Sequence, residues 1–288
     1  MNVGRSPGEL PLRERAVAIG TFDGVHVGHR RVLEAAVAAS GAASVVTFDP
    51  HPRTASGTPT PLLTTLERRL ELLAAAGIED TLVVRLDEAL ADGGADQLAA
   101  TVLRPFGARV VVGREGARFG RERLGDLRAL AALGLDVRPV PLVEGVSSQR
   151  IRQLVAAGEL GAAARLLGRP VEVEGVVHEG DRRGRLLGFP TANLGVADEM
   201  LVPPYGIYAG ATRGHRAAIS IGVNPHFGGG ERRLEAFLLD YEGDLYGERL
   251  VVELWARLRE ERAFTDEAAL VTQIVQDVAE ARKAARPA

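Results

Sequence analysis

The chain contains no cysteine and only one lysine, and these two absences narrow the chemistry open to it. Without cysteine, the chain has no disulfides, thiolate zinc sites or cysteine nucleophiles. The single lysine is Lys283, so arginine supplies the other 34 of the 35 basic residues. A Walker-type phosphate loop and a Schiff-base enzyme both need a suitably placed lysine, so neither is expected. Phosphate binding would therefore depend on arginine, histidine, backbone amides or a metal ion.

Long apolar runs and basic aromatic stretches are also missing. No stretch approaches the roughly 20 apolar residues of a membrane span, and residues 1–15 lack the apolar core of a secretory signal. We therefore expect a cytoplasmic protein with no membrane partner. A formal net charge of −3 and 5% aromatic residues argue against nucleic-acid binding. With 288 residues, 46% of them hydrophobic, the composition fits a globular protein of two domains.

The first part of the chain alternates short apolar runs with helical segments. Strands are predicted at 16–20, 43–48, 81–86, 108–113 and 136–143, and helices at 30–39, 66–77 and 126–134. Strands that alternate with helices at this spacing predict an α/β domain, in which a parallel sheet is covered by helices on both faces.

From about residue 171 the pattern changes to strand-like runs that are separated by glycine-containing turns, without helices between them. Such a pattern predicts an all-β, antiparallel barrel or sandwich, of which we expect the barrel. An amphipathic helix is expected at 266–285. Because the change falls near the sequence LLGRP, we expect one domain at 1–168 and a second at 169–288.

The stretch GTFDGVHVGH, which begins at Gly20, follows the first predicted strand and leads into the first predicted helix. In open α/β sheets, ligands bind in the crevice at this edge. Gly20, Gly24 and Gly28 let the backbone turn sharply, and the helix start favours an anion. His26 and His29, one helical turn apart, would donate hydrogen bonds to phosphate oxygens. The alternatives are a polar turn with chance histidines, or a zinc site for which no third ligand is evident nearby.

Two further stretches carry polar side chains that would complete such a site. In VSSQRIRQL, Ser147 or Ser148 would cap a helix whose first turns carry Arg150 and Arg152. Capping alone explains the serines, but beside the histidine turn the arginines would form a second clamp for a triphosphate. In TFDPHP, Asp49 lies at the same edge of the predicted sheet.

The stretches GTFDGVHVGHRRVLEAA, VVTFDPHP and SSQRIR together resemble the nucleotidyltransferase module of bacterial bifunctional riboflavin kinase/FAD synthetases. The second half is similar to the riboflavin kinase module of that family in GRLLGFPTANL, YGIYAG, SIGVNPHF, LEAFLLDYEGDLYGERL and LREERAFTDEAAL. The resemblance covers about residues 16–283. It implies a Rossmann-like nucleotidyltransferase domain followed by a kinase barrel. It also implies a Mg²⁺-dependent enzyme that uses ATP to phosphorylate riboflavin to FMN and to adenylylate FMN to FAD.

The side chains of the second half agree with this resemblance. Thr191 and Asn193 offer neutral oxygens two residues apart, which suit a Mg²⁺ ion that also binds substrate phosphates. Gly184 and Gly188 would let a loop close over those phosphates, with Arg185 beside them.

Glu235 is the lone acid within an otherwise apolar strand-like run. A solvent-facing or ion-paired glutamate is one interpretation. The resemblance implies instead a general base that takes the proton of the ribityl 5′-hydroxyl as it attacks the γ-phosphate. Arg259 and Phe264 match a family segment that lies near the flavin.

The predicted site residues fall into four groups, and their expected partners are riboflavin, FMN, FAD and ATP. The groups are catalytic His26, His29, Arg152 and Glu235; ATP-binding Gly20, Phe22, Asp23, Gly24, Ser147, Ser148, Arg150, Gly184, Arg185 and Gly188; flavin-binding Asp49, Arg259 and Phe264; and the Mg²⁺ ligands Thr191 and Asn193. The sequence leaves the oligomeric state open.

Parts of the chain depart from the family pattern. VGREGARFGRERLGD at 112–126 replaces the usual VGxDFxFG, Gln149 and His226 stand where the family usually has threonine, and expected phenylalanines are absent from 86–98. The kinase half is therefore expected to be intact, whereas the first half diverges around its flavin pocket. Two alternatives follow: a riboflavin kinase only, with a nucleotide-binding first module, or a non-catalytic flavin- or nucleotide-binding regulator.

Overall fold

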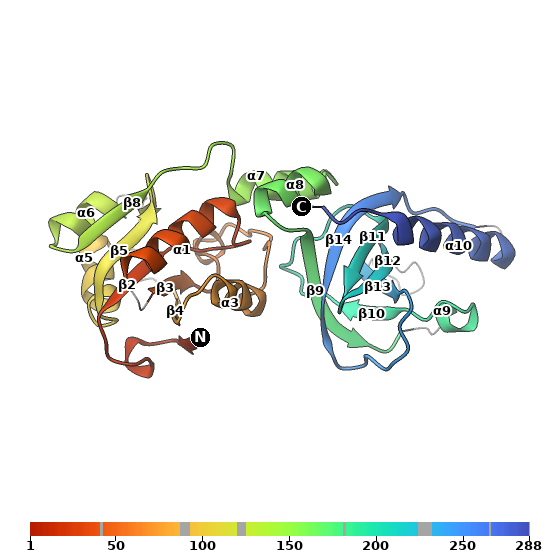
Figure 1. Cartoon of the computed structure of the whole chain (residues 1–288), viewed down its shortest axis with the longest axis horizontal. Helices are drawn as coiled ribbons and strands as arrows, with labels where there is room; N and C mark the ends of the chain where they lie inside the picture. The colour runs from red at the N-terminus through yellow and green to blue at the C-terminus, as the bar shows by residue number, and fades with distance from the viewer. Residues whose placement is uncertain are drawn as a thin grey trace. The chain divides into compact units, whose positions relative to one another are not determined.

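The computed structural model describes residues 1–40, 43–86, 93–119, 125–180, 183–223, 232–264 and 266–287. The chain divides into two compact units (Figure 1). The first comprises Met1–Thr60 and Thr64–Ser147, and the second comprises Pro61–Leu63 and Ser148–Ala288. Each unit has buried apolar clusters of its own.

The first unit is built on a six-stranded parallel sheet with the order β1-β4-β3-β2-β5-β8. Its strands are β1 (Asn2–Gly4), β2 (Arg15–Ile19), β3 (Ala43–Phe48), β4 (Asp80–Val84), β5 (Ala108–Arg114) and β8 (Asp136–Val140). Strands β2, β3 and β4 are buried along their whole length and mostly apolar, as expected for a parallel sheet that is covered on both faces. The strand order reverses at β2, between β3 and β5, so the carboxyl end of β2 is the topological switch point.

Helices cover both faces of this sheet because successive strand residues point to opposite sides. On one face Ala18 and Val45 pack with Leu33 of α1 and Leu73 of α3. On the other face Val17 and its neighbours pack with α5 and α6. The helical segments are η1 (Pro7–Glu9), α1 (Val27–Ala39), α2 (Pro52–Ala55), α3 (Leu66–Ala75), α5 (Ala95–Leu98), η2 (Ala99–Leu103) and α6 (Leu127–Ala132), and a hairpin is formed by β6 (Arg118–Phe119) and β7 (Gly125–Asp126).

A buried ion cluster closes the amino end of the sheet. Asp80, which is fully buried at the start of β4, accepts hydrogen bonds from Arg13, from the buried Arg15 and from Asn2, at 2.7 to 3.2 Å. Burial raises the pKa of the Asp80 carboxyl, but the hydrogen bonds from Asn2, Arg13 and Arg15 outweigh burial and hold this pKa below its ordinary value. The cluster ties β1 and the segment before β2 to β4.

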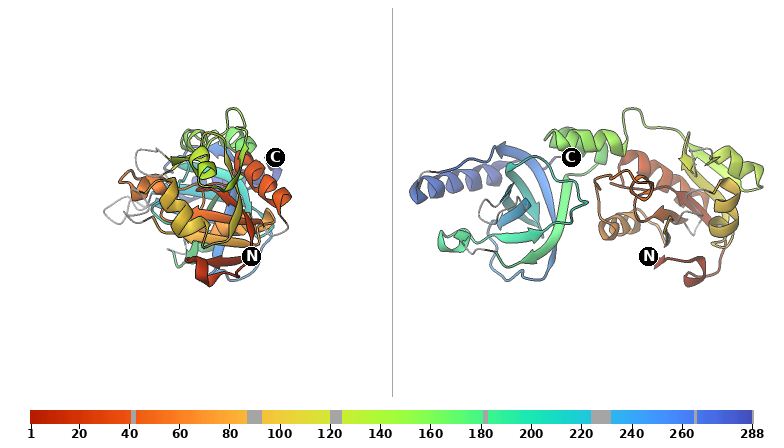
Figure 2. Two further views of the ribbon diagram at one scale, coloured as in Figure 1. Left: turned by 90° about the vertical axis from the view of Figure 1, so that its left-hand side faces the viewer. Right: turned by 180° about the vertical axis from the view of Figure 1, so that it is seen from behind.

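The second unit is a closed antiparallel barrel with the order β10-β13-β12-β11-β14-β9 (Figure 2). Its strands are β9 (Val171–His178), β10 (Ala192–Gly195), β11 (Gly206–Thr212), β12 (His215–Val223), β13 (Arg232–Leu238) and β14 (Arg249–Arg259). Inward-facing Tyr208, Ile219, Leu234 and Val252 fill the barrel. Its helices are α7 (Ser148–Ala156), α8 (Leu160–Leu167), α9 (Arg183–Leu186) and α10 (Glu267–Lys283).

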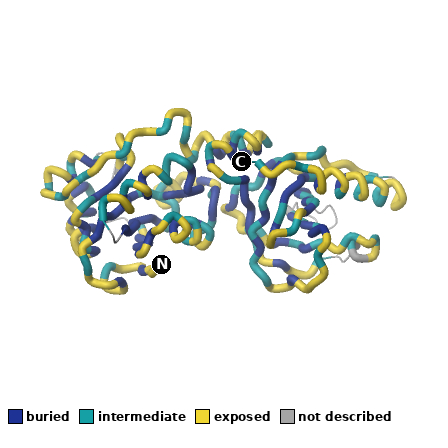
Figure 3. The backbone as a smooth tube through the Cα atoms, in the orientation of Figure 1, coloured by how far each residue is buried: buried dark blue, intermediate teal, exposed yellow. Residues whose placement is uncertain are grey.

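The predicted fold class, an α/β sheet domain followed by a β-barrel and a terminal helix, is confirmed. The predicted strands and helices of both halves are present, and in each unit the buried backbone follows the strands (Figure 3). Among the described residues, four strands had not been predicted: β1, β6, β7 and β10. The first three have only two or three residues each, too few to show a pattern. β10 overlaps the end of the GFPTANL stretch, for which only ligand binding was expected.

Candidate active sites

The turn between β2 and α1 has an unusual backbone. Phe22, Gly24 and Val25 have positive φ angles of 53°, 84° and 36°. A positive φ is costly for a β-branched residue such as Val25, and such strain gathers at ligand-binding sites. The turn is held by Thr64, whose amide donates to Asp23 Oδ1 at 3.1 Å and whose hydroxyl accepts from the Gly24 amide at 3.1 Å. Asp23 is buried, so its described contacts stabilise the turn.

His26 and His29 lie together at the start of α1. His26 caps the helix, since its Nδ1 accepts the His29 amide at 3.2 Å. The rings are stacked, with centroids 3.6 Å apart and 11° between their planes, and the edge of Phe22 meets His29. Because Nδ1 accepts, a neutral His26 carries its proton on Nε2, where it serves as a donor. The predicted pairing of the two histidines at the switch point of the sheet is therefore present. A Cβ atom on Gly28 would lie only 3.2 Å from the His26 ring, so glycine leaves room for this ring.

Asp49 directly follows β3, at the same sheet edge as the turn. The predicted arginine helix is present as α7, but it belongs to the second compact unit, as do Ser148, Arg150 and Arg152. Within it, Arg152 is buried and its Nε donates to the Pro61 carbonyl at 2.6 Å, while Arg150 is exposed. Ser147 is exposed and ends the first unit.

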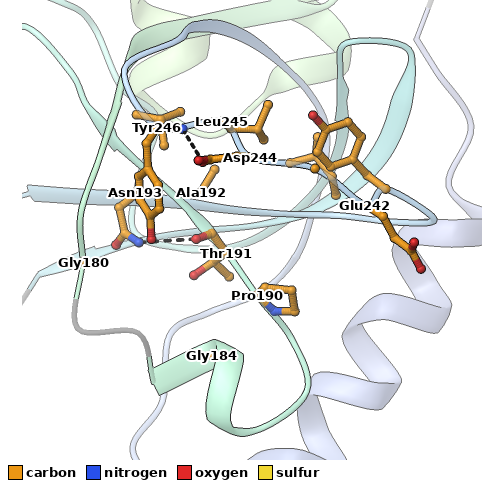
Figure 4. Close-up of a pocket in the computed structure, with 14 residues that line it drawn as sticks. Gly180, Gly184, Pro190, Thr191, Ala192, Asn193, Glu242, Asp244, Leu245 and Tyr246 are labelled. Atoms are coloured by element: carbon orange, nitrogen blue, oxygen red, sulfur yellow. Dashed lines mark hydrogen bonds between the residues drawn. The ribbon is translucent and has the colours of Figure 1, made fainter.

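A cavity of about 550 Å³ opens at one end of the barrel (Figure 4). Thr191, Ala192 and Asn193, at the start of β10, form one wall, and the loop that follows β13 forms another. That loop is part of the stretch LEAFLLDYEGDLYGERL, whose loop side chains had been given no role. Its lining residues are Tyr241, Glu242, Gly243, Asp244, Leu245 and Tyr246.

Glu235 lies beside this cavity because of strand register. Asn193 of β10 is directly opposite Glu235 of β13, and Ser220 of β12 flanks it on the other side. The Thr191 hydroxyl donates to Glu235 Oε2 at 3.1 Å. Glu235 thus shares a hydrogen bond with one predicted Mg²⁺ ligand and a strand pair with the other.

Thr191 and Asn193 fit a Mg²⁺ ion by the chemistry of their donors. The Thr191 hydroxyl gives its hydrogen to Glu235, so its oxygen lone pairs remain open to a cation, and Asn193 contributes a side-chain carbonyl beside it. A Cβ on Gly180 would lie 2.4 Å from the Asn193 amide nitrogen, so only glycine leaves room for this side chain. No cluster of three or more histidine or acidic residues suited to a metal is present among the described residues.

Two positions in the loop before β10 require glycine for steric reasons. A Cβ on Gly184 would lie 2.4 Å from the Phe189 carbonyl oxygen, and Gly188 has a φ of 87°. Gly184 lines the cavity. The side chain of Arg185, residue His226, and parts of 86–98 and 112–126 lie outside the described residues.

Arg259 and Phe264 are near each other, with the guanidinium carbon 5.8 Å from the ring centroid. Arg259 also forms a bidentate ion pair with Asp277 of α10, with its closest contact at 2.7 Å. The described contacts of Arg259 thus join β14 to the terminal helix, and neither residue lines the cavity.

The fold and the two sites define a two-module protein of the nucleotide-dependent transferase class. The riboflavin kinase family model matches residues 167–285, and the FAD synthetase family model matches residues 10–152. The bifunctional riboflavin kinase/FMN adenylyltransferase of Pseudomonas fluorescens is 35% identical over 93% of this chain and 92% of its own length. The protein of the same name from Listeria monocytogenes is 31% identical over 93% and 91%. The chain therefore belongs to the bifunctional riboflavin kinase/FMN adenylyltransferase family.

A solved structure described as a macrolide-efflux protein from Streptococcus pneumoniae is also similar. It has a TM-score of 0.86 and 29% identity, and the match covers 98% of this chain and 99% of that one. Within the described residues, no helix has the length and apolarity needed to cross a membrane.

The family assignment confirms the predicted resemblance and the predicted enzyme class, which joins kinase and adenylyltransferase activities in flavin cofactor biosynthesis. The two alternatives, a kinase alone and a regulator without turnover, are not favoured, because both family models match. ATP use follows from the families.

Proposed function

We propose that the barrel cavity converts riboflavin to FMN and that the histidine turn converts FMN to FAD, with ATP as the co-substrate of both. The observation that carries the first assignment is the contact of Glu235 with Thr191 at the wall of the cavity. The stacked histidines on the strained turn carry the second. We assign the modules to residues 1–168 and 169–288, and the order of the family matches supports this assignment.

In the kinase reaction, Glu235 accepts the proton of the ribityl 5′-hydroxyl while that oxygen attacks the γ-phosphorus and ADP leaves. Thr191 already donates to Oε2, so it holds the carboxylate in place and leaves Oε1 to accept. Thr191 and Asn193 would hold a Mg²⁺ ion, which neutralises charge on the phosphates. Gly184, Gly188 and Arg185 would surround those phosphates, and Arg259 and Phe264 would lie toward the flavin.

In the adenylyltransferase reaction, an oxygen of the FMN phosphate attacks the α-phosphorus of ATP, and pyrophosphate leaves. His26 Nε2–H and the His29 ring would donate hydrogen bonds where negative charge builds up. The turn between β2 and α1 would bind ATP, and its shape is set by Gly20, Phe22, Asp23 and Gly24. By the family resemblance, the ATP-binding roles of Ser147, Ser148 and Arg150, the catalytic role of Arg152 and the flavin contact of Asp49 remain part of this proposal.

The direct test is incubation of the protein with riboflavin, ATP and Mg²⁺, with chromatography to resolve FMN and FAD over time. We expect FMN to appear first and FAD to follow. Chelation of the metal should stop FMN formation, and added Mg²⁺ should restore it. FMN without FAD, even with excess FMN and ATP, would contradict the adenylyltransferase assignment and support the kinase-only alternative.

The metal ligands have a separate test. Asn193→Ala should raise the Mg²⁺ concentration that half-saturates FMN formation by on the order of tenfold, because one oxygen ligand is lost. Asn2→Ala in the first unit serves as the matched control. An unchanged Mg²⁺ requirement would contradict the assignment of Asn193.

Both reactions consume ATP, in keeping with the expected cytoplasmic location.

A further inference from the structure

Arg69, on α3 of the first unit, is a buried cation that none of the roles above uses. Its side chain is fully buried, although it belongs to the most strongly hydrated class of residues. Its Nε and Nη2 atoms are buried and have no hydrogen-bond partner among the described residues. A buried arginine with donors left unsatisfied lowers the stability of the folded protein. A position that needed only packing would carry an apolar residue.

The hydrogen bonds that Arg69 does make lead to the two segments of the histidine site. Its Nη1 donates to the Phe48 carbonyl at 3.0 Å, in the residue just before Asp49. The same nitrogen lies 3.5 Å from Thr47 Oγ1, and that hydroxyl donates to the Thr21 carbonyl at 2.9 Å. One guanidinium therefore connects the end of β3 to the turn that follows β2.

The charges around Arg69 point to the same site. Burial lowers the pKa of the Arg69 guanidinium, and the carboxylates of Asp23 and Asp49 oppose this effect. Asp23 is buried within the turn and Asp49 follows β3, so the pair would bring two negative charges to a site that takes polyphosphate and FMN. A fixed cation that interacts with both carboxylates offsets that repulsion.

We propose that Arg69 is a positioning residue of the adenylyltransferase site: it fixes the turn at residues 20–25 relative to Asp49 and balances the charge of the two acids. Because it is fully buried, Arg69 acts through Phe48, Thr47 and Thr21 and not by contact with substrate. This inference rests on the proposed function of the histidine turn. The preceding residue, Arg68, is partly exposed and pairs with Glu71 at 2.7 Å.

The test compares Arg69→Met, Arg69→Lys and the control Arg68→Met in the full chain. For Arg69→Met, kcat for FAD formation should fall on the order of 100-fold, since a displacement of about 1 Å has that effect on a catalytic group. The KM for ATP should change less. Arg69→Lys keeps a cation that reaches the Phe48 carbonyl and should restore most of the activity. Kinase activity and Arg68→Met should stay near the wild-type values.

Thr47→Val supplies a second variant if Arg69→Met folds poorly. It removes the hydroxyl that links Arg69 to the turn, so it should lower FAD formation by itself and add little in an Arg69→Met background. Full activity per folded molecule in either single variant, or additive losses in the double variant, would overturn the proposal.

The exchange rates of the backbone amides at residues 20–25 test the positioning role of Arg69 without a measurement of activity. In Arg69→Met these amides should exchange on the order of tenfold faster, while those of the barrel stay unchanged. Unchanged exchange in the turn would overturn the positioning role even if FAD formation fell. If the wild-type protein formed no FAD, the proposed function would fail, whereas the exchange result would still decide the role of Arg69.

Discussion

The two units hold their candidate sites by different means. In the first unit the site is a loop that consists of a strained turn, a helix cap and two stacked histidines. Thr64 contacts this turn directly, and Arg69 contacts the end of β3 beside it. In the barrel, Glu235 and Asn193 lie on paired strands, and backbone register sets their spacing. A site on a loop depends on the side chains that stabilise the loop. A site on paired strands depends on the backbone hydrogen bonds that join those strands.

This difference predicts how each site responds to substitution. Around the histidine turn, changes several residues away should lower activity, because the supporting contacts come from β3, from Thr64 and from Arg69 of α3. Around Glu235, only residues that touch the cavity should matter strongly. The predictions below test this contrast and the separation of the two reactions.

The largest effect is expected from Glu235→Gln. The substitution keeps the size of the side chain but removes the base, so FMN formation should fall by about 10²- to 10⁴-fold. FAD formation from supplied FMN should be unchanged. Glu260→Gln, at an exposed acid, is the matched control. Initial rates with each substrate check the prediction, and near-normal FMN formation would leave Glu235 with a structural role only.

His29→Ala should give the reverse pattern. Loss of a hydrogen-bond donor at the transferring phosphate costs about 10²- to 10³-fold in comparable sites, so FAD formation should fall by that factor while FMN formation persists. Arg31→Ala, exposed on the same helix, is the control. A mixture of the His29→Ala and Glu235→Gln proteins should convert riboflavin to FAD through released FMN. Failure of that mixture would contradict separate active sites.

Asp80→Asn should destabilise the first unit by about 3 kcal/mol at neutral pH, because Arg15 would lose its buried partner. The folded-state pKa of Asp80 is lowered, so its stabilisation is complete above about pH 4 and is lost as pH falls further. The difference between wild type and variant should therefore shrink in acid. Urea unfolding between pH 3 and 7 measures this, with the surface acid variant Asp136→Asn as the control. A difference that grew in acid would contradict the sign.

Much of the fold could be predicted from the sequence because the apolar residues of each half follow a clear pattern of strand-like and helical segments. Valine-rich runs such as 43–48 alternate with helical segments, and the barrel runs follow one another directly. The pairing of His26 with His29 was also predictable, since both lie within one helical turn. The stacking of their rings was not, because it depends on the strained backbone of the turn.

The supporting residues could not be predicted because they come from distant segments. Arg69 gives no sequence signal beyond an arginine pair in an amphipathic helix, and only the fold shows that it reaches Phe48. The contact of Thr191 with Glu235 spans 44 residues and depends on strand register. A threonine pair ahead of the helix at 66–77 was the one available signal for the Thr64 contact.

The smallest effect is expected at the cap of α10. The Asp266 carboxylate accepts the Ala269 amide at 2.8 Å, and α10 packs on the barrel through Ala281 and the Asp277–Arg259 pair. Asp266→Ala should lower the stability of the barrel unit by about 1 kcal/mol, whereas Asp266→Asn, which can still cap, should lower it less. Calorimetry would report the loss as a small drop in the unfolding temperature of the barrel unit. Because the cap lies outside the cavity and outside the first unit, kcat for both reactions should be unchanged at 25 °C. A change in FAD formation would show that the terminal helix influences the histidine turn, and the contrast between the two units would then have to include coupling between them.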